Sequence, residues 1–189
     1  MHGLSTFSGR FLAERLNLGR YRRLLDLGAG SGVISAKLAE RFPNLKATLL
    51  DLPEVCEVAE ELRRSSPATK RLTTRPQSYL EPLPRGHDVA LLSQILHAEN
   101  ERTCRHLLRR VYEALARPGL IIVIEFALSK EKTGPLLPAL FSLNMLINTE
   151  EGAAYSGDEI MRWLREAGFR KTRARKLPGD RTLFTAEKA

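Results

Sequence analysis

Residues 24–35, LLDLGAGSGVIS, decide the fold of this chain. A short apolar run leads into Asp26 and ends at a turn with three glycines at alternate positions, Gly28, Gly30 and Gly32. An apolar run of this length predicts a strand, and the helical spacing of apolar residues after the glycines predicts a helix. A glycine turn between a first strand and its helix lets a ligand approach the backbone closely. The stretch therefore predicts a site for a nucleotide-like ligand.

The rest of the chain alternates between apolar strand patterns and amphipathic helix patterns. This order predicts an α/β fold with a mostly parallel sheet covered by helices on both faces, closed by an antiparallel hairpin. No element is assigned to the polar link after residue 64 or to an irregular insertion at 129–155. The predicted strands are 23–28, 46–51, 88–96, 120–128 and the hairpin 170–177 with 181–188, and the predicted helices are 35–42, 53–64, 101–115 and 156–169.

Length and composition set the class of protein. A chain of 189 residues is the size of one domain, so we expect a single domain over 1–189. No apolar run is long enough to span a membrane, and the first residues, MHGLSTFSGR, lack the features of a secretory signal, so we expect a cytoplasmic protein. Cys56 and Cys104 lie in helix patterns, where buried thiols are expected rather than a disulfide or a metal site.

The net charge of +8 raises the question of a nucleic-acid partner, because basic proteins bind phosphates. The arginines are scattered, however, and the single dense cluster, RKTRARK at 170–176, alternates like a strand and has no aromatic residues to stack on bases. We therefore expect a solvated arginine-rich surface and no nucleic-acid partner. A phosphate-binding patch is the alternative.

The spacing of the loop separates two classes of cofactor. Nicotinamide dinucleotides require G-x-G-x-x-G, but here the third glycine comes one residue early and Val33 occupies the dinucleotide position. Asp51 ends the next strand, and its carboxylate could accept hydrogen bonds from both hydroxyls of a ribose. The pattern favours S-adenosylmethionine (SAM), whose amino-acid end would face the loop. The alternative is a glycine turn that only packs and an Asp51 that only caps a helix.

Five segments in order resemble the SAM-dependent small-molecule O-methyltransferases of the acetylserotonin and caffeic acid type. These are LLDLGAGSG, LLDLPEVCEVAEE, HDVALLSQILHAENERTCRHLLRRVYEALARPG, LFSLNMLINTEEG and WLREAGF, which cover the chain from about residue 20 on. The resemblance implies a Rossmann-like class I fold with seven strands, SAM as cofactor and S-adenosylhomocysteine as product. It implies substrate contacts by Asn144 and Met145, and cofactor contacts by Asp26, Gly28, Gly30, Gly32, Asp51, Leu52, Gln77 and Ser93.

The resemblance also implies a catalytic role for His97, which follows the predicted strand in SQILH. In the family, a histidine at this point removes the proton of the acceptor hydroxyl. Without the resemblance, a lone histidine here would be a structural residue, the role we expect for His87 and His106. The family's aspartate for the adenine amine is replaced by Gln77, which could still accept through its amide oxygen, and Leu52 is expected to pack on the adenine.

Several features depart from the family pattern. The acid that orients the histidine cannot be aligned, and Glu150 or Glu151 is the candidate. We expect no counterpart of the family's N-terminal helical domain, which dimerises and covers the acceptor, so the chain would be either a minimal enzyme or an excised catalytic domain. The acceptor site would then come from the N-terminal helix, the insertion at 129–155, or a partner, either a second copy or a separate lid domain.

Two other functions remain open from the sequence. The chain could be a SAM-binding module without methyl transfer, because the surroundings of His97 differ from the family at Ala98 and near Gly152. A nucleic-acid methyltransferase is disfavoured, because SQILHAEN has no Asn/Asp-Pro-Pro-Tyr/Phe segment. The acceptor itself, an oxygen, nitrogen or carbon nucleophile, cannot be read from the sequence.

Overall fold

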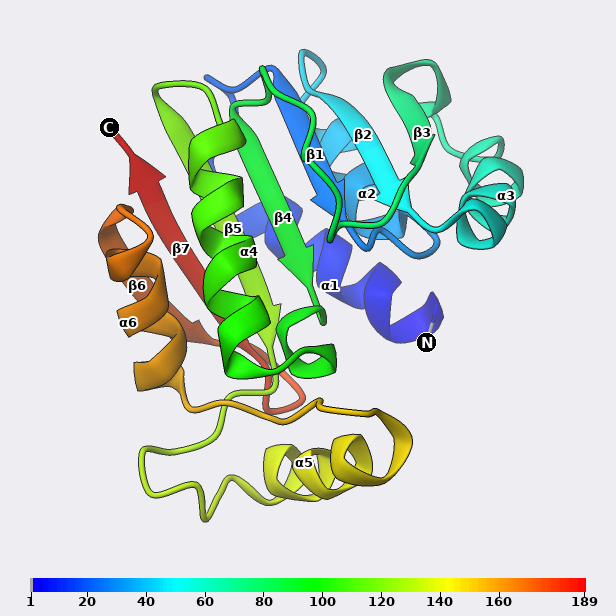
Figure 1. Cartoon of the computed structure of the whole chain (residues 1–189). Coiled ribbons are helices and arrows are strands. Elements are labelled where there is room, and N and C mark those ends of the chain that lie inside the picture. The colour runs from blue at the N-terminus through cyan, green and yellow to red at the C-terminus, as the bar shows by residue number, and fades with distance from the viewer. Residues whose placement is uncertain (1) are drawn as a thin grey trace. The chain divides into compact units, whose positions relative to one another are not determined.

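The computed structural model describes residues 2–189, with residues 2–8 described by their backbone alone. Its strands form a seven-stranded sheet in the order β3-β2-β1-β4-β5-β7-β6 (Figure 1). Strands β1, β2 and β3 pair in parallel, whereas β5, β7 and β6 pair antiparallel. The predicted fold class is confirmed. The chain divides into two compact units, one up to Leu91 and one from Leu92 on, which are described in turn.

The first unit is built from two strand–helix repeats around buried parallel strands. In β1 every residue after the first is buried, as expected for an apolar run flanked by helices. Helix α2 begins directly after the glycine turn, two residues earlier than its apolar pattern predicts. The elements are α1 (His2–Arg15), β1 (Arg23–Leu27), α2 (Val33–Arg41), β2 (Lys46–Asp51), α3 (Pro53–Arg63), the 3-10 helix η1 (Thr69–Arg71), β3 (Leu72–Pro76) and the first part of β4 (Val89–Ser93).

Two features of this unit differ from the sequence prediction. The polar link contains β3, which pairs with β2 from Leu72 to Pro76. Only Leu72 of this strand is buried, so its sequence carries no strand pattern of apolar residues. Helix α3, whose apolar residues at helical spacing predict one buried face, buries Cys56 and Ala59 but leaves Val58 and Leu62 exposed.

The second unit contains the most apolar strand, β5, in which all but one residue is buried. Helix α6 begins with a capping box: the Ser156 hydroxyl accepts from the Glu159 N–H, and the Glu159 carboxylate accepts from the Ser156 N–H. The elements from Leu92 on are the end of β4, the 3-10 helix η2 (Leu96–Ala98), α4 (Glu101–Ala114), β5 (Gly119–Glu125), α5 (Leu136–Asn148), α6 (Gly157–Glu166), β6 (Arg170–Lys176) and β7 (Thr182–Lys188).

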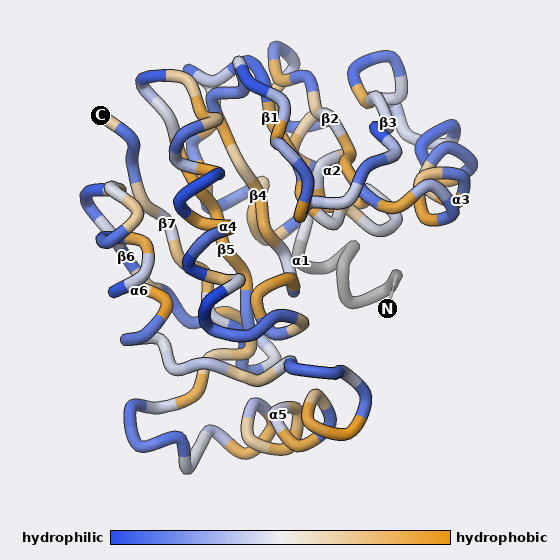
Figure 2. The backbone as a smooth tube through the Cα atoms, viewed as in Figure 1, coloured by the Kyte–Doolittle hydropathy of each residue, from blue (hydrophilic) through white to orange (hydrophobic). Residues whose placement is uncertain are grey.

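The insertion predicted to be irregular contains helix α5. Its sequence, LLPALFSLNMLIN, has no charged residue, and Figure 2 shows it in mostly hydrophobic colours. A helix that is apolar nearly all round shows no amphipathic period, which is why the pattern failed to predict it. Its side chains Leu136, Leu137, Leu140, Leu143, Leu146 and Ile147 are between 45 and 80% exposed.

Strand β6 is at the outer edge of the sheet order, and six of its seven residues are exposed. It is the RKTRARK cluster, and it forms the predicted hairpin with β7. Lys171 has a positive φ of 50°, and the pairing register shifts between Arg170 and Arg173, as at a β-bulge. Lys171 also pairs with Glu187 of β7 at 2.8 Å.

Both cysteines are free and buried in helices, as predicted. Among the described residues, no helix combines the length and apolar composition that a membrane crossing requires. No group of three or more His, Cys, Asp or Glu side chains within residues 9–189, whose side chains the structure describes, is placed to hold a metal ion.

Candidate active site

The glycine loop of the first unit connects β1 to α2 through three left-handed residues. Gly28, Gly30 and Gly32 have φ values of 62°, 54° and 68°, a conformation that disfavours any side chain. A Cβ on Gly32 would lie 2.5 Å from Leu49 Cδ1, so a side chain there would have to displace the buried Leu49 side chain. A Cβ on Gly30 would meet no heavy atom within 4 Å. The loop therefore presents bare backbone to open space at Gly30.

Asp51 lies at the end of β2, beside this loop. Its Oδ2 accepts from the Gly30 N–H at 2.7 Å, and its Oδ1 accepts from the Leu52 N–H at 2.8 Å. Each carboxylate oxygen has a second lone pair for another donor. Leu52, next to it, is 45% exposed. The arrangement places an acceptor group and an apolar surface next to the exposed backbone of Gly30.

Gln77 follows β3, and its backbone N–H donates to the Asp51 carbonyl oxygen at 2.8 Å. The amide oxygen, expected to accept from an adenine amine, already accepts from Arg75 Nε at 2.7 Å. The amide nitrogen donates to the Pro82 carbonyl oxygen at 2.9 Å. The structure thus places Gln77 beside Asp51, but both the oxygen and the nitrogen of its side-chain amide already form hydrogen bonds within the protein.

Asp26 is buried in β1, with only 2% of its surface exposed. The pKa of its carboxyl is raised to about 7, mainly because burial disfavours the charged form. The Ser35 hydroxyl, which donates to Oδ2 at 2.6 Å, lowers this pKa, and the negative charge of Asp51 raises it further. A cavity of about 230 Å³ borders the other flank of the loop at Ser31, Gly32 and Val33.

The raised pKa of Asp26 predicts how stability depends on pH. The folded chain holds this proton up to about pH 7 and the unfolded chain only up to about 4, so the free energy of unfolding should fall as pH rises through that window. The loss from this one group is at most about 4 kcal/mol. Urea unfolding at pH 5 and pH 8 measures the larger part of this loss, and Asp26→Asn should lose less stability over this interval than the parent. Equal pH dependence in both proteins would contradict the prediction.

In the second unit, the chain turns sharply after β4 at Gln94, which has a positive φ of 63°, and then forms η2. Ser93 is the half-buried last residue of β4. His97 lies in η2, with 14% of its side chain exposed. Its Nδ1 is 2.8 Å from Glu125 Oε2.

Glu125 ends β5 and is 2% exposed. Its other oxygen, Oε1, accepts from the Leu96 N–H at 2.7 Å. Because a carboxylate only accepts, His97 Nδ1 carries the proton in this pair, which leaves Nε2 as the basic nitrogen. A buried carboxylate thus fixes both the backbone and the tautomer of the histidine.

This geometry corrects the expectation about the orienting acid, because Glu125 makes the contact with His97. Glu150 is exposed, and Glu151 accepts from the Asn100 side chain. The sequence signal for Glu125 was an acid at the carboxyl end of the most apolar strand, LIIVIE, where a charge needs a partner.

The two predicted substrate residues lie on α5. Met145 is buried, and Asn144 is exposed, with its backbone oxygen accepting from the Asn148 side chain at 3.0 Å. One turn earlier, the Phe141 ring meets the His97 ring edge-on, with centroids 4.7 Å apart. No sequence motif points to Phe141.

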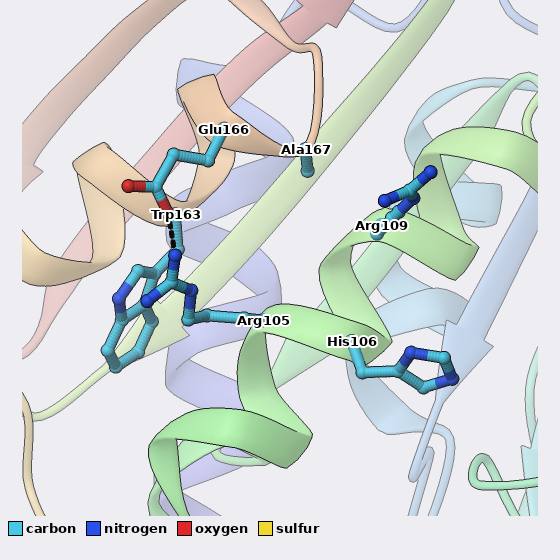
Figure 3. A pocket seen from close by; sticks show the side chains of 6 residues that line it. All are labelled: Arg105, His106, Arg109, Trp163, Glu166 and Ala167. Carbon is cyan, nitrogen blue, oxygen red and sulfur yellow. Dashed lines mark ion pairs between the residues drawn. The ribbon is translucent and has the colours of Figure 1, made fainter.

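A cavity of about 280 Å³ lies between α4 and α6 (Figure 3). Arg105 and Glu166, on opposite sides of it, form an ion pair at 3.0 Å. His106 lines this cavity, and His87 contacts Thr48 Oγ1 at 3.0 Å in the first unit. None of the side chains predicted to bind cofactor or substrate lines the cavity of Figure 3.

Residues 1–170 match the family model of an O-methyltransferase domain. The chain belongs to this O-methyltransferase domain family. This confirms the resemblance of its motifs, and family members are SAM-dependent enzymes.

The O-methyltransferase domain is similar to several named proteins. It is 37% identical to 3-hydroxy-5-methyl-1-naphthoate 3-O-methyltransferase of Streptomyces sahachiroi, covering 98% of this chain and 54% of that protein. The structure of human N-acetylserotonin methyltransferase in complex with SAM superposes with a TM-score of 0.86 at 31% identity, covering 96% of this chain and 52% of that one. PigF with SAH gives 0.88 at 30% identity, covering 98% and 56%. The domain spans about half the length of the curated relatives it matches.

Proposed function

We propose that the chain binds SAM and transfers its methyl group to a hydroxyl of a small aromatic or enolic acceptor. The observation that carries the proposal is the His97–Glu125 pair, which leaves Nε2 of a half-buried histidine free to take a proton. The acceptor class is supported by the relatives, among them an enzyme named for a hydroxyl of a naphthoate.

The residues of the first unit fit the cofactor. Gly28 and Gly30 give close access to the backbone, Asp51 offers lone pairs to the ribose hydroxyls, and Leu52 offers an apolar surface to the adenine. Asp26, through its buried carboxyl, supports the turn from β1 into the loop. Ser93 and Gln77 complete the proposed cofactor contacts. When bound, SAM supplies a methyl group on a sulfonium, which is a good leaving group.

The residues of the second unit provide the acid–base chemistry. His97 Nε2 takes the proton of the acceptor hydroxyl as the oxygen becomes nucleophilic, and Glu125 stabilises the imidazolium that forms. A general base contributes a factor of about 100 to 10,000, and alignment of the reacting atoms contributes several kcal/mol. Met145 and Asn144 are the proposed acceptor contacts. A second copy or a separate lid domain would complete the acceptor site.

Calorimetry and turnover test the proposal together. We expect the chain to bind SAM and S-adenosylhomocysteine but not NADH, because the loop lacks the glycine spacing for a pyrophosphate. We also expect methylation of at least one compound in a panel of phenols and hydroxynaphthoates. Binding of NADH without SAM would overturn the proposal. Binding of SAM without any turnover would favour a SAM-binding module, and methylation of DNA or RNA alone would favour a nucleic-acid enzyme.

Substitution of Asp51 tests the cofactor site. Asp51→Ala should weaken SAM binding by about 1.5–3 kcal/mol, because hydrogen bonds to a charged group are lost. The matched control is Glu54→Ala, an exposed acid in the first turn of α3, which should bind SAM like the parent. Calorimetry on variants with unchanged melting temperature measures both. Normal affinity in Asp51→Ala would mean that the ribose is held elsewhere.

A further inference from the structure

The turn that carries His97 is held by a segment far along the chain, residues 141–155. Phe141 packs edge-on against the His97 ring, with centroids 4.7 Å apart and planes at 90°. The Tyr155 hydroxyl donates to the Glu99 carbonyl oxygen at 2.5 Å. A Cβ on Gly152 would lie 2.5 Å from the His97 carbonyl oxygen, so the two backbones touch there. The position of His97 therefore depends on this segment as well as on Glu125.

Among these contacts, only that of Phe141 reaches the imidazole ring. The hydrogen bond from Nδ1 to Glu125 fixes one atom of the ring but leaves rotation about the direction of that bond. An edge-on contact defines the plane of the second ring, and such pairs contribute about 0.5–1.5 kcal/mol beyond burial. The two contacts together set where Nε2 points.

Phe141 is itself held in place. Its ring contacts Phe126, the residue after Glu125, with centroids 4.7 Å apart and planes at 44°. Met145 lies one helical turn further on the same side of α5 and is buried. Glu125 and Phe126 both lie at the end of β5. Glu125 contacts the imidazole directly, and Phe126 contacts Phe141, which in turn packs against the imidazole.

We propose that Phe141 is a positioning residue for methyl transfer: it fixes the plane of the His97 imidazole so that Nε2 faces the acceptor hydroxyl. This inference rests on the proposed function in taking His97 as the base. It assigns no contact with acceptor or cofactor to Phe141. A general base displaced by about 1 Å can lose about 100-fold in rate, so the effect should be measurable.

The test compares three variants of the full chain with a phenol that the parent methylates. Phe141→Ala should lower kcat by about 10- to 100-fold, with SAM affinity unchanged and a smaller change in KM. Phe141→Tyr keeps the ring and should retain kcat within about threefold of the parent. Ile147→Ala, at an 80% exposed position of the same helix, is the control and should match the parent. The deficit of Phe141→Ala should shrink as pH ionises the phenol, because proton removal is then no longer needed.

A spectroscopic readout separates this inference from the proposed function. The His97 Cε1–H resonance, assigned by its loss in His97→Ala, should shift or broaden in Phe141→Ala and stay near its parent position in Phe141→Tyr. This holds even if no acceptor is turned over. If Phe141→Ala does not fold, Phe141→Leu, which keeps the apolar bulk without the ring, takes its place. A reduced melting temperature with unchanged kcat and an unchanged His97 resonance would overturn the inference.

Discussion

His97→Ala should lower methyl transfer to a hydroxyl acceptor by at least about 100-fold, because the lost step is proton removal in the transition state. SAM affinity should remain close to that of the parent, since no proposed cofactor contact is removed. Raising the pH should partly restore the rate with a phenol, because its own ionisation supplies the nucleophile. Initial rates from pH 6 to 10, with calorimetry for SAM, measure both effects.

The matched control is His106→Ala, which removes a histidine that lines the cavity between α4 and α6 instead (Figure 3). It should leave the rate unchanged. If His97 were structural, its removal would lower the melting temperature and weaken SAM binding together with any rate loss. Equal rates for His97→Ala and the parent would show that methyl transfer proceeds by alignment alone or with a base from another chain.

Glu125→Gln should cost nearly as much as the loss of His97, about 100-fold or more in kcat, because the orienting carboxylate controls the tautomer of the base. Glu125 accepts two hydrogen bonds, from the Leu96 N–H and from His97 Nδ1. The amide oxygen of glutamine can replace one, but its NH₂ group would face a donor at the other. If the NH₂ group faces Nδ1, His97 accepts from it by moving its proton to Nε2, which removes the base; if it faces the Leu96 N–H, a buried donor is left unsatisfied at a cost of about 1–3 kcal/mol.

Steady-state rates at saturating SAM measure this prediction, with the fraction of folded protein determined by thermal unfolding. Glu150→Gln is the control, because Glu150 is exposed. It should behave like the parent. A rate loss in Glu150→Gln, with normal turnover in Glu125→Gln, would restore the original expectation that an acid at 150–151 orients the base.

The parts of the fold that local patterns encode were predictable from the sequence. The glycine turn, the buried strand β1 before it and the helix α2 after it each depend on residues within one or two turns of chain. Strand β3 was missed because its pairing with β2, and not apolar burial, makes it a strand. Helix α5 was missed because a helix with no charged residue and few polar ones shows no clear amphipathic period.

The candidate site also contains residues whose placement could be predicted from the sequence and residues whose placement could not. Asp51 and the loop are separated by one helix, so their meeting followed from strand order, and Gly30 and Asp51 are indeed hydrogen bonded. Glu125 lies 28 residues after His97, and its pairing depends on where β5 ends. The family pattern directed attention to acids further along the chain. Phe141 could not be found, because its helix had not been predicted.

The cationic edge strand β6 has a consequence for how copies of this chain behave in concentrated solution. An edge strand offers unpaired N–H and C=O groups to any other strand, which is how folded proteins begin to aggregate. Two copies pairing through β6 would bring two rows of arginine and lysine side chains within about 4.8 Å of one another. Five of the seven residues are cations and the bulge at Lys171 interrupts the straight edge. The charge of β6 and its bulge are therefore both expected to oppose pairing with another strand.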